Sequence, residues 1–102
     1  MYKFKELKAG SRLYVGGVKK MEFSILGITS TEIINGYLKL VCENRRGNII
    51  VLFIPINHIN ANKIRIGNNM IFTNHFEWSE YATDMINGNA VCSLMFGLGN
   101  TD

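Results

Sequence analysis

The sequence has no long apolar run, and it is poor in cysteine and histidine. Its longest apolar run is Ile49 to Ile56, well short of the roughly 18 residues that a transmembrane helix needs. Cys42 and Cys92 are the only two cysteines, too few for a disulfide scaffold, and we expect buried thiols. The two histidines show no spacing with cysteine or with each other that is typical of a zinc site. We therefore predict no membrane span and no metal.

A secretory signal is also missing from the expected position. The opening stretch is MYKFKELKAG, which is charged and contains no apolar segment of the kind that directs secretion. Together with the low cysteine content, this predicts a cytoplasmic protein in a reducing compartment. Proline occurs once, whereas asparagine and isoleucine are abundant. That bias is typical of an AT-rich genome, such as that of a low-GC bacterium or its phage.

Catalytic motifs are absent as well. The sequence contains no GxSxG, P-loop or GxGxxG pattern. The glycines of Gly97-Leu98-Gly99 are followed by no helix that could hold a phosphate. Nothing in the local sequence pairs a cysteine with His58 or His75 as a hydrolytic dyad. We therefore expect a protein that is not an enzyme and that uses no cofactor.

Glycine and asparagine turns separate short stretches in which apolar and polar residues alternate, a pattern typical of β-strands. Gly16-Gly17 predicts a two-residue turn, because glycine accepts positive φ without steric cost. Thr29–Gly36 is expected to be a connection with a short helical turn near Ser30, and Gly27 is a candidate bulge. The predicted strands are Arg12–Val15, Val18–Ile28, Tyr37–Glu43, Ile49–Ile56, Lys63–Ile66, Met70–Thr73 and Ala90–Leu98.

The strand predicted at Ile49–Ile56 differs from the others because it is apolar on both faces. Such a strand lies either in the centre of a sheet that is covered on both sides, or in a sheet whose second face meets a partner. Pro55 has no N–H to donate to a neighbouring strand, so we expect it near the strand end or at a bulge.

One helix is predicted late in the chain, over Ser79–Asn87. Ser79 is its expected N-cap, Tyr81 and Met85 share a face at helical spacing, and Gly88 is a natural stop. A hairpin through Asn87-Gly88 is the alternative. The whole chain, 1–102, is therefore predicted to be a single β-rich domain. Its fold class is mainly β or α+β, a small antiparallel barrel or sheet of six to seven short strands with one late helix near 79–87.

Charge is distributed unevenly along the chain. Residues 1–65 contain all 11 basic residues and four acidic ones, a balance of +7, whereas residues 66–102 contain four acidic residues and no basic one, a balance of −4. The two balances sum to the net charge of +3. This asymmetry predicts that the basic part meets an acidic partner, which includes another copy of the chain.

The basic part contains the candidate binding residues. Arg45 and Arg46 occupy a predicted hairpin loop, and arginine presents a fork of N–H donors that suits phosphate oxygens. Nearby aromatic rings can stack on bases. The alternative is that these cations are simply solvated, or that lysines protect strand edges. The candidates for ligand or nucleic-acid binding are Arg45, Arg46, Lys19, Lys20, Lys3 and Lys5, with Tyr2, Phe4 and Trp78 as aromatic contacts.

Three functions are compatible with these observations. The first is a non-enzymatic binding or interaction module that associates with itself, since its apolar stretches exceed what so small a chain can cover internally. The second is binding of nucleic acid or of a nucleotide-like phosphorylated ligand through the basic part. The third is a phage inhibitor of a host defence system that acts by binding a ligand or a protein. An acidic protein is a further possible partner of the basic part.

Overall fold

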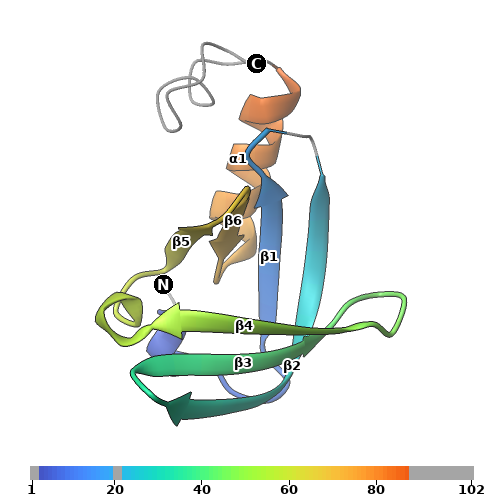
Figure 1. Cartoon of the computed structure of the whole chain (residues 1–102). Coiled ribbons are helices and arrows are strands. Elements are labelled where there is room, and N and C mark those ends of the chain that lie inside the picture. Colours follow the sequence, from blue (N-terminus) through green and yellow to red (C-terminus); the bar gives the residue numbers. More distant parts are fainter. Residues whose placement is uncertain (1–2, 20–21, 88–102) are drawn as a thin grey trace.

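In a computed structural model that describes residues 3–19 and 22–87, the chain forms a curled half-barrel of six antiparallel strands with one late helix (Figure 1). The strand order is β4-β3-β2-β1-β6-β5. The predicted mainly β class is therefore confirmed. The strands are β1 (Arg12–Gly17), β2 (Phe23–Ile34), β3 (Tyr37–Glu43), β4 (Ile49–Pro55), β5 (Lys63–Ile66) and β6 (Asn69–Phe72), and the helices are the 3-10 turns η1 (Phe4–Glu6) and η2 (Ile56–His58) and the α-helix α1 (His75–Ile86).

The inner face of the curled sheet holds the main hydrophobic core. Figure 1 shows β3 and β4 running across the lower ends of β1 and β2. The long strand β2 pairs with both β1 and β3, and its register shifts between Ile28 and Ser30. The turn η1 closes the core, and the Phe4 ring is fully buried. The other buried members of this core are Leu7, Leu13, Leu26, Ile28, Leu38, Leu40, Cys42, Ile54 and Ile71.

The helix α1 packs on the opposite face of the sheet, against β1 and β6 (Figure 1). A second buried cluster lies there, formed by Val18, Met70, Phe72, Tyr81 and Met85. Two hydrogen bonds attach the helix to β1: the Tyr81 hydroxyl donates to the carbonyl of Gly17 at 2.7 Å, and Trp78 Nε1 donates to that of Val15 at 2.9 Å. The helix thus covers one half of this outer face and leaves the half made by β3 and β4 uncovered among the described residues.

The predicted turn at Gly16-Gly17 is wrong, because both glycines belong to β1. The connection predicted at Thr29–Gly36 is also wrong, since β2 continues to Ile34 and contains no helical turn. The hairpin turn is instead Asn35-Gly36, whose φ values of +51° and +82° are those of a tight antiparallel hairpin. The bulge predicted at Gly27 is displaced to the irregularity that follows Ile28.

The second half of the chain follows the predicted layout more closely. The hairpin of β5 and β6 agrees with the prediction to within one residue, and Pro55 ends β4 as expected. The helix starts at His75, because the side chain of Asn74, not that of Ser79, accepts the N–H of Glu77 as the N-cap. The strand predicted at Ala90–Leu98 lies outside the described residues.

The position of β4 decides between the two interpretations of the apolar stretch at Ile49–Ile56. A central strand covered on both sides is wrong for the described residues, because β4 lies at one end of the strand order and its outer side chains are exposed. The interpretation that its second face meets a partner stays a prediction.

Gly16 gives a stability prediction, because a Cβ atom there would lie 2.8 Å from the Tyr81 ring. The hydrogen bond to Gly17 holds that ring in place. We expect Gly16→Ala to lower the free energy of unfolding by about 1–3 kcal/mol through overpacking. Gly27→Ala is the control, since its Cβ would make an ordinary contact at 3.9 Å with the carbonyl of Glu43. Urea titration of both variants checks this, and equal losses would contradict it.

Candidate functional site

Large apolar side chains are exposed on the outer face of β4 and its neighbours. The inner side chains of β3 are buried and those of β4 are buried or half-buried, whereas the side chains that point outward are exposed or half-buried. Ile49, Phe53 and Val51 keep 63%, 49% and 42% of their surface accessible, which is uncommon for neighbouring apolar residues of one strand. We call this surface the outer patch and define its residues as Ile34, Tyr37, Ile49, Val51 and Phe53.

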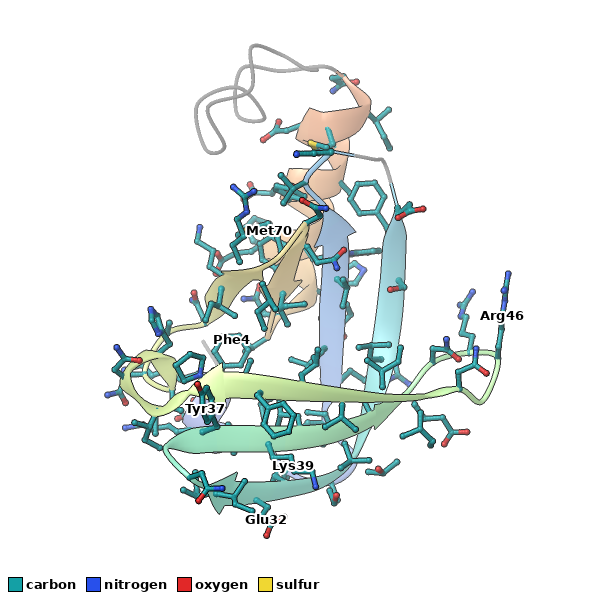
Figure 2. All side chains as sticks on the ribbon, in the orientation of Figure 1. Phe4, Glu32, Tyr37, Lys39, Arg46 and Met70 are labelled. Carbon is teal, nitrogen blue, oxygen red and sulfur yellow. The ribbon has the colours of Figure 1, made fainter. Side chains whose placement is uncertain are left out.

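The outer patch spans three strands in register. Tyr37 of β3 and Phe53 of β4 pack edge to face with their ring centres 6.0 Å apart. The patch is not flat, because it contains a hollow of about 550 Å³. Ile34, Tyr37 and Phe53 line this hollow together with Asn35 and Lys39. Lys39 stands beside Phe53 on one side and Glu32 on the other, so that the charges next to the patch balance (Figure 2).

The two edges of the sheet differ in how they are protected. The edge strand β5 is four residues long and carries Lys63 and Arg65. The edge strand β4 is seven residues long and carries no charged residue. Its one protective feature is Pro55, at the very end. Natural sheets commonly defend exposed edges with short strands and charged side chains. By that standard β5 is protected, whereas β4 has no such protection within the described part of the chain.

A second feature lies where the β3–β4 loop, residues 44–48, approaches α1. Figure 2 shows Arg46 extending from the tip of this loop. The loop, β2 and the helix together line a groove of about 500 Å³, which we call the arginine groove. Its lining residues are Phe23, Ser24, Ile25, Asn44, Arg45, Arg46 and Trp78.

The structure brings together only some of the predicted binding residues. Arg45, Arg46 and Trp78 all line the arginine groove. Lys3 precedes η1 and Lys5 lies within it, and neither they nor Lys19, which follows β1, lines that groove. Phe4 is fully buried and serves the core. Two further candidates, Tyr2 and Lys20, lie outside the described residues.

Sequence reasoning did not find the remaining lining residues of the arginine groove. Phe23, Ser24, Ile25 and Asn44 complete the groove, and no local pattern relates them to Trp78. A larger hollow of about 750 Å³, near the start of α1, was also not predicted. Lys8 and Arg12 line it, but so does the carboxylate-bearing Glu6, which makes its charge mixed.

Among the described residues, no interaction joins Cys42 to either histidine. Burial raises the pKa of the Cys42 thiol to about 11, so that it is protonated at neutral pH and is a poor nucleophile. Cys42 lies in the inner core. His75 lies on the outer face, where the centre of its ring is 5.4 Å from the ring centres of both Tyr14 and Trp78. His58 is exposed in η2. No group of three or more histidine, cysteine or acidic side chains among the described residues is placed to hold a metal ion.

The described geometry therefore offers two candidate surfaces, one apolar and one cationic, on the same side of the sheet as α1.

None of the helices that the structure describes has the length and apolar character needed to cross a membrane. A comparison of the chain with protein-family models, with curated proteins and with solved structures finds no match.

Proposed function

We propose that this protein is a non-enzymatic interaction module that associates with a second copy of itself through the outer patch. The observation that carries the proposal is the row of exposed apolar side chains on the unprotected edge strand β4. Removing a large apolar side chain from water contributes about 1.5–3 kcal/mol. A partner that covers Ile49, Val51 and Phe53 thus gains enough to offset part of the cost of association.

The chemistry of the outer patch favours a second copy as the partner. Its exposed members are all apolar or aromatic, and the adjacent Lys39 and Glu32 are cross-strand neighbours of opposite sign. Such a surface selects neither a strongly acidic nor a strongly basic partner. Two identical apolar faces are complementary to each other when a twofold axis relates them. The two sheets then pack face to face about 10 Å apart, as in a β-sandwich.

Separately, we propose that the protein is cytoplasmic. Cys42 is free and buried, which suits a reducing compartment.

The hollow beside Tyr37 and Phe53 offers space for a side chain of the partner copy. We expect the rim of the interface, which includes Lys39, to stay accessible to water.

Phe53→Lys tests the proposal, because it places a charge in the middle of the outer patch. We expect this variant to be a monomer at micromolar concentration while the unchanged protein is a dimer, as measured by light scattering after size exclusion. The Phe53 side chain is half exposed on an edge strand, so the fold should tolerate lysine.

Phe76→Lys is the matched control, since Phe76 is 65% exposed on α1 and lies outside the outer patch. It should leave the dimer intact. Equal molar masses for Phe53→Lys and the unchanged protein would overturn the proposed interface, and so would dissociation caused equally by Phe76→Lys.

A further inference from the structure

The arginine groove combines positive charge with aromatic walls. Arg45 and Arg46 come from the loop after β3, whereas Phe23 and Trp78 come from β2 and α1. No carboxylate belongs to the groove's lining residues. Within the described part of the chain, neither guanidinium group forms an ion pair. The groove therefore has cationic hydrogen-bond donors that form no ion pair with a described residue.

The loop that carries the two arginines is held by its own hydrogen bonds. Asn44 Oδ1 accepts the backbone N–H groups of Arg46 at 2.9 Å and of Asn48 at 3.0 Å. Gly47 adopts a φ of +84°, which closes the turn. Because the backbone is fixed in this way, a ligand of the arginines has to order only their side chains.

The aromatic wall is fixed as well. Trp78 Nε1 donates to the carbonyl of Val15 at 2.9 Å, which holds the indole against β1. Phe23 packs edge to face on this ring with a centre-to-centre distance of 6.0 Å. Both rings are half-buried, so that part of each stays accessible from the groove. A planar ring of a ligand can pack on such a surface.

We propose that the arginine groove binds a nucleoside phosphate. Arg45 and Arg46 donate to the phosphate oxygens, for which guanidinium forks are well suited. The base packs against Trp78 and Phe23. A mononucleotide fits better than a nucleic-acid strand, because the exposed Lys3 and Lys5 lie away from the groove and do not extend it as a basic track.

Trp78 supplies the readout, since it is the only tryptophan in the chain. Titration with ADP should change the intrinsic tryptophan fluorescence in a saturable way at up to millimolar concentrations. Inorganic phosphate supplies charge without a ring, and adenosine supplies a ring without charge. Each of these should bind more weakly than ADP. Equal responses to ADP and to inorganic phosphate would show that the groove recognises charge alone, and no saturable response to ADP would overturn the site.

Arg45→Ala combined with Arg46→Ala should weaken ADP binding about tenfold or more, since charge-assisted hydrogen bonds are lost. Lys8→Ala combined with Arg12→Ala removes the same charge from the other hollow and should leave the affinity unchanged. An equal loss in both double variants would contradict the proposal. Thermal unfolding checks that each variant is folded, and single Arg45→Gln and Arg46→Gln variants repeat the test with less change to the loop.

This site stands apart from self-association, because none of its lining residues belongs to the outer patch. The Phe53→Lys variant should therefore bind ADP as the unchanged protein does, which keeps the two proposals separately testable.

Discussion

Leu40→Ala should lower the free energy of unfolding by about 2–5 kcal/mol. Leu40 is fully buried in the middle of the inner core, on β3, with Thr31 and Leu52 as its neighbours in the adjacent strands. Truncation removes three carbon atoms from a site that the surrounding sheet cannot close, so a cavity remains. Urea titration gives the loss directly.

The control for Leu40→Ala is Ile49→Ala, on the outer face of β4. Ile49 is 63% exposed, so its truncation should change the stability of one chain by less than about 0.5 kcal/mol. Both changes are best made in the Phe53→Lys background, where dissociation of a dimer does not add to the measured stability. Similar losses for both variants would contradict the assignment of inner and outer faces.

Leu52→Pro should destabilise the protein by at least about 2 kcal/mol more than Val51→Pro. The backbone N–H of Ile56 donates to the carbonyl of Gly36, which belongs to the β2–β3 turn, so this N–H points toward β3. Because N–H groups alternate in direction along an extended strand, that of Leu52 points toward β3 and that of Val51 points toward the free edge. Proline at position 52 therefore removes a ladder hydrogen bond, whereas proline at position 51 removes none.

Circular dichroism and urea titration of the two proline variants measure this difference. The unpaired carbonyl of Leu40, which faces Leu52 across the ladder, accounts for much of the expected cost. Equal destabilisation by Val51→Pro and Leu52→Pro would contradict the free edge. It would mean that the side of β4 that faces away from β3 is also hydrogen-bonded in solution.

The alternation of residue types predicted the strands well, but it misplaced the turn near Gly16. Gly16 lies within β1 because the Tyr81 ring packs where a Cβ would be. Gly16 and Tyr81 are 65 positions apart in the chain, so no local pattern reveals their contact. The real hairpin at Asn35-Gly36 carries a dipeptide typical of such turns. The strand predicted at Val18–Ile28 overlaps β2 but ends six residues before Ile34, because the prediction placed a connection at Thr29–Gly36.

Three residues of the arginine groove were predicted from the sequence, but their assembly into one site was not. Arg45 and Arg46 were expected in a hairpin loop, and that is where the structure places them. Their proximity to Trp78 follows from the tertiary arrangement, in which α1 packs beside β2. The similar candidates Lys3 and Lys5 lie elsewhere for the same reason, since the N-terminal segment pairs with Ile59 and Ala61.

The outer patch shows what a sequence pattern can and cannot decide. The apolar residues on both faces of β4 are visible in the sequence, and they indicated either a central strand or a strand that meets a partner. Only the strand order distinguishes an edge from a centre, and strand order depends on long-range pairing that local propensity does not determine.

The molar mass of the unchanged protein in solution tests the central claim most directly. Light scattering over a range of concentrations should give twice the 11.5 kDa of one chain at micromolar concentration, and a fall toward the monomer value on dilution. A constant mass of 11.5 kDa at every concentration, up to the solubility limit, would contradict self-association through the outer patch.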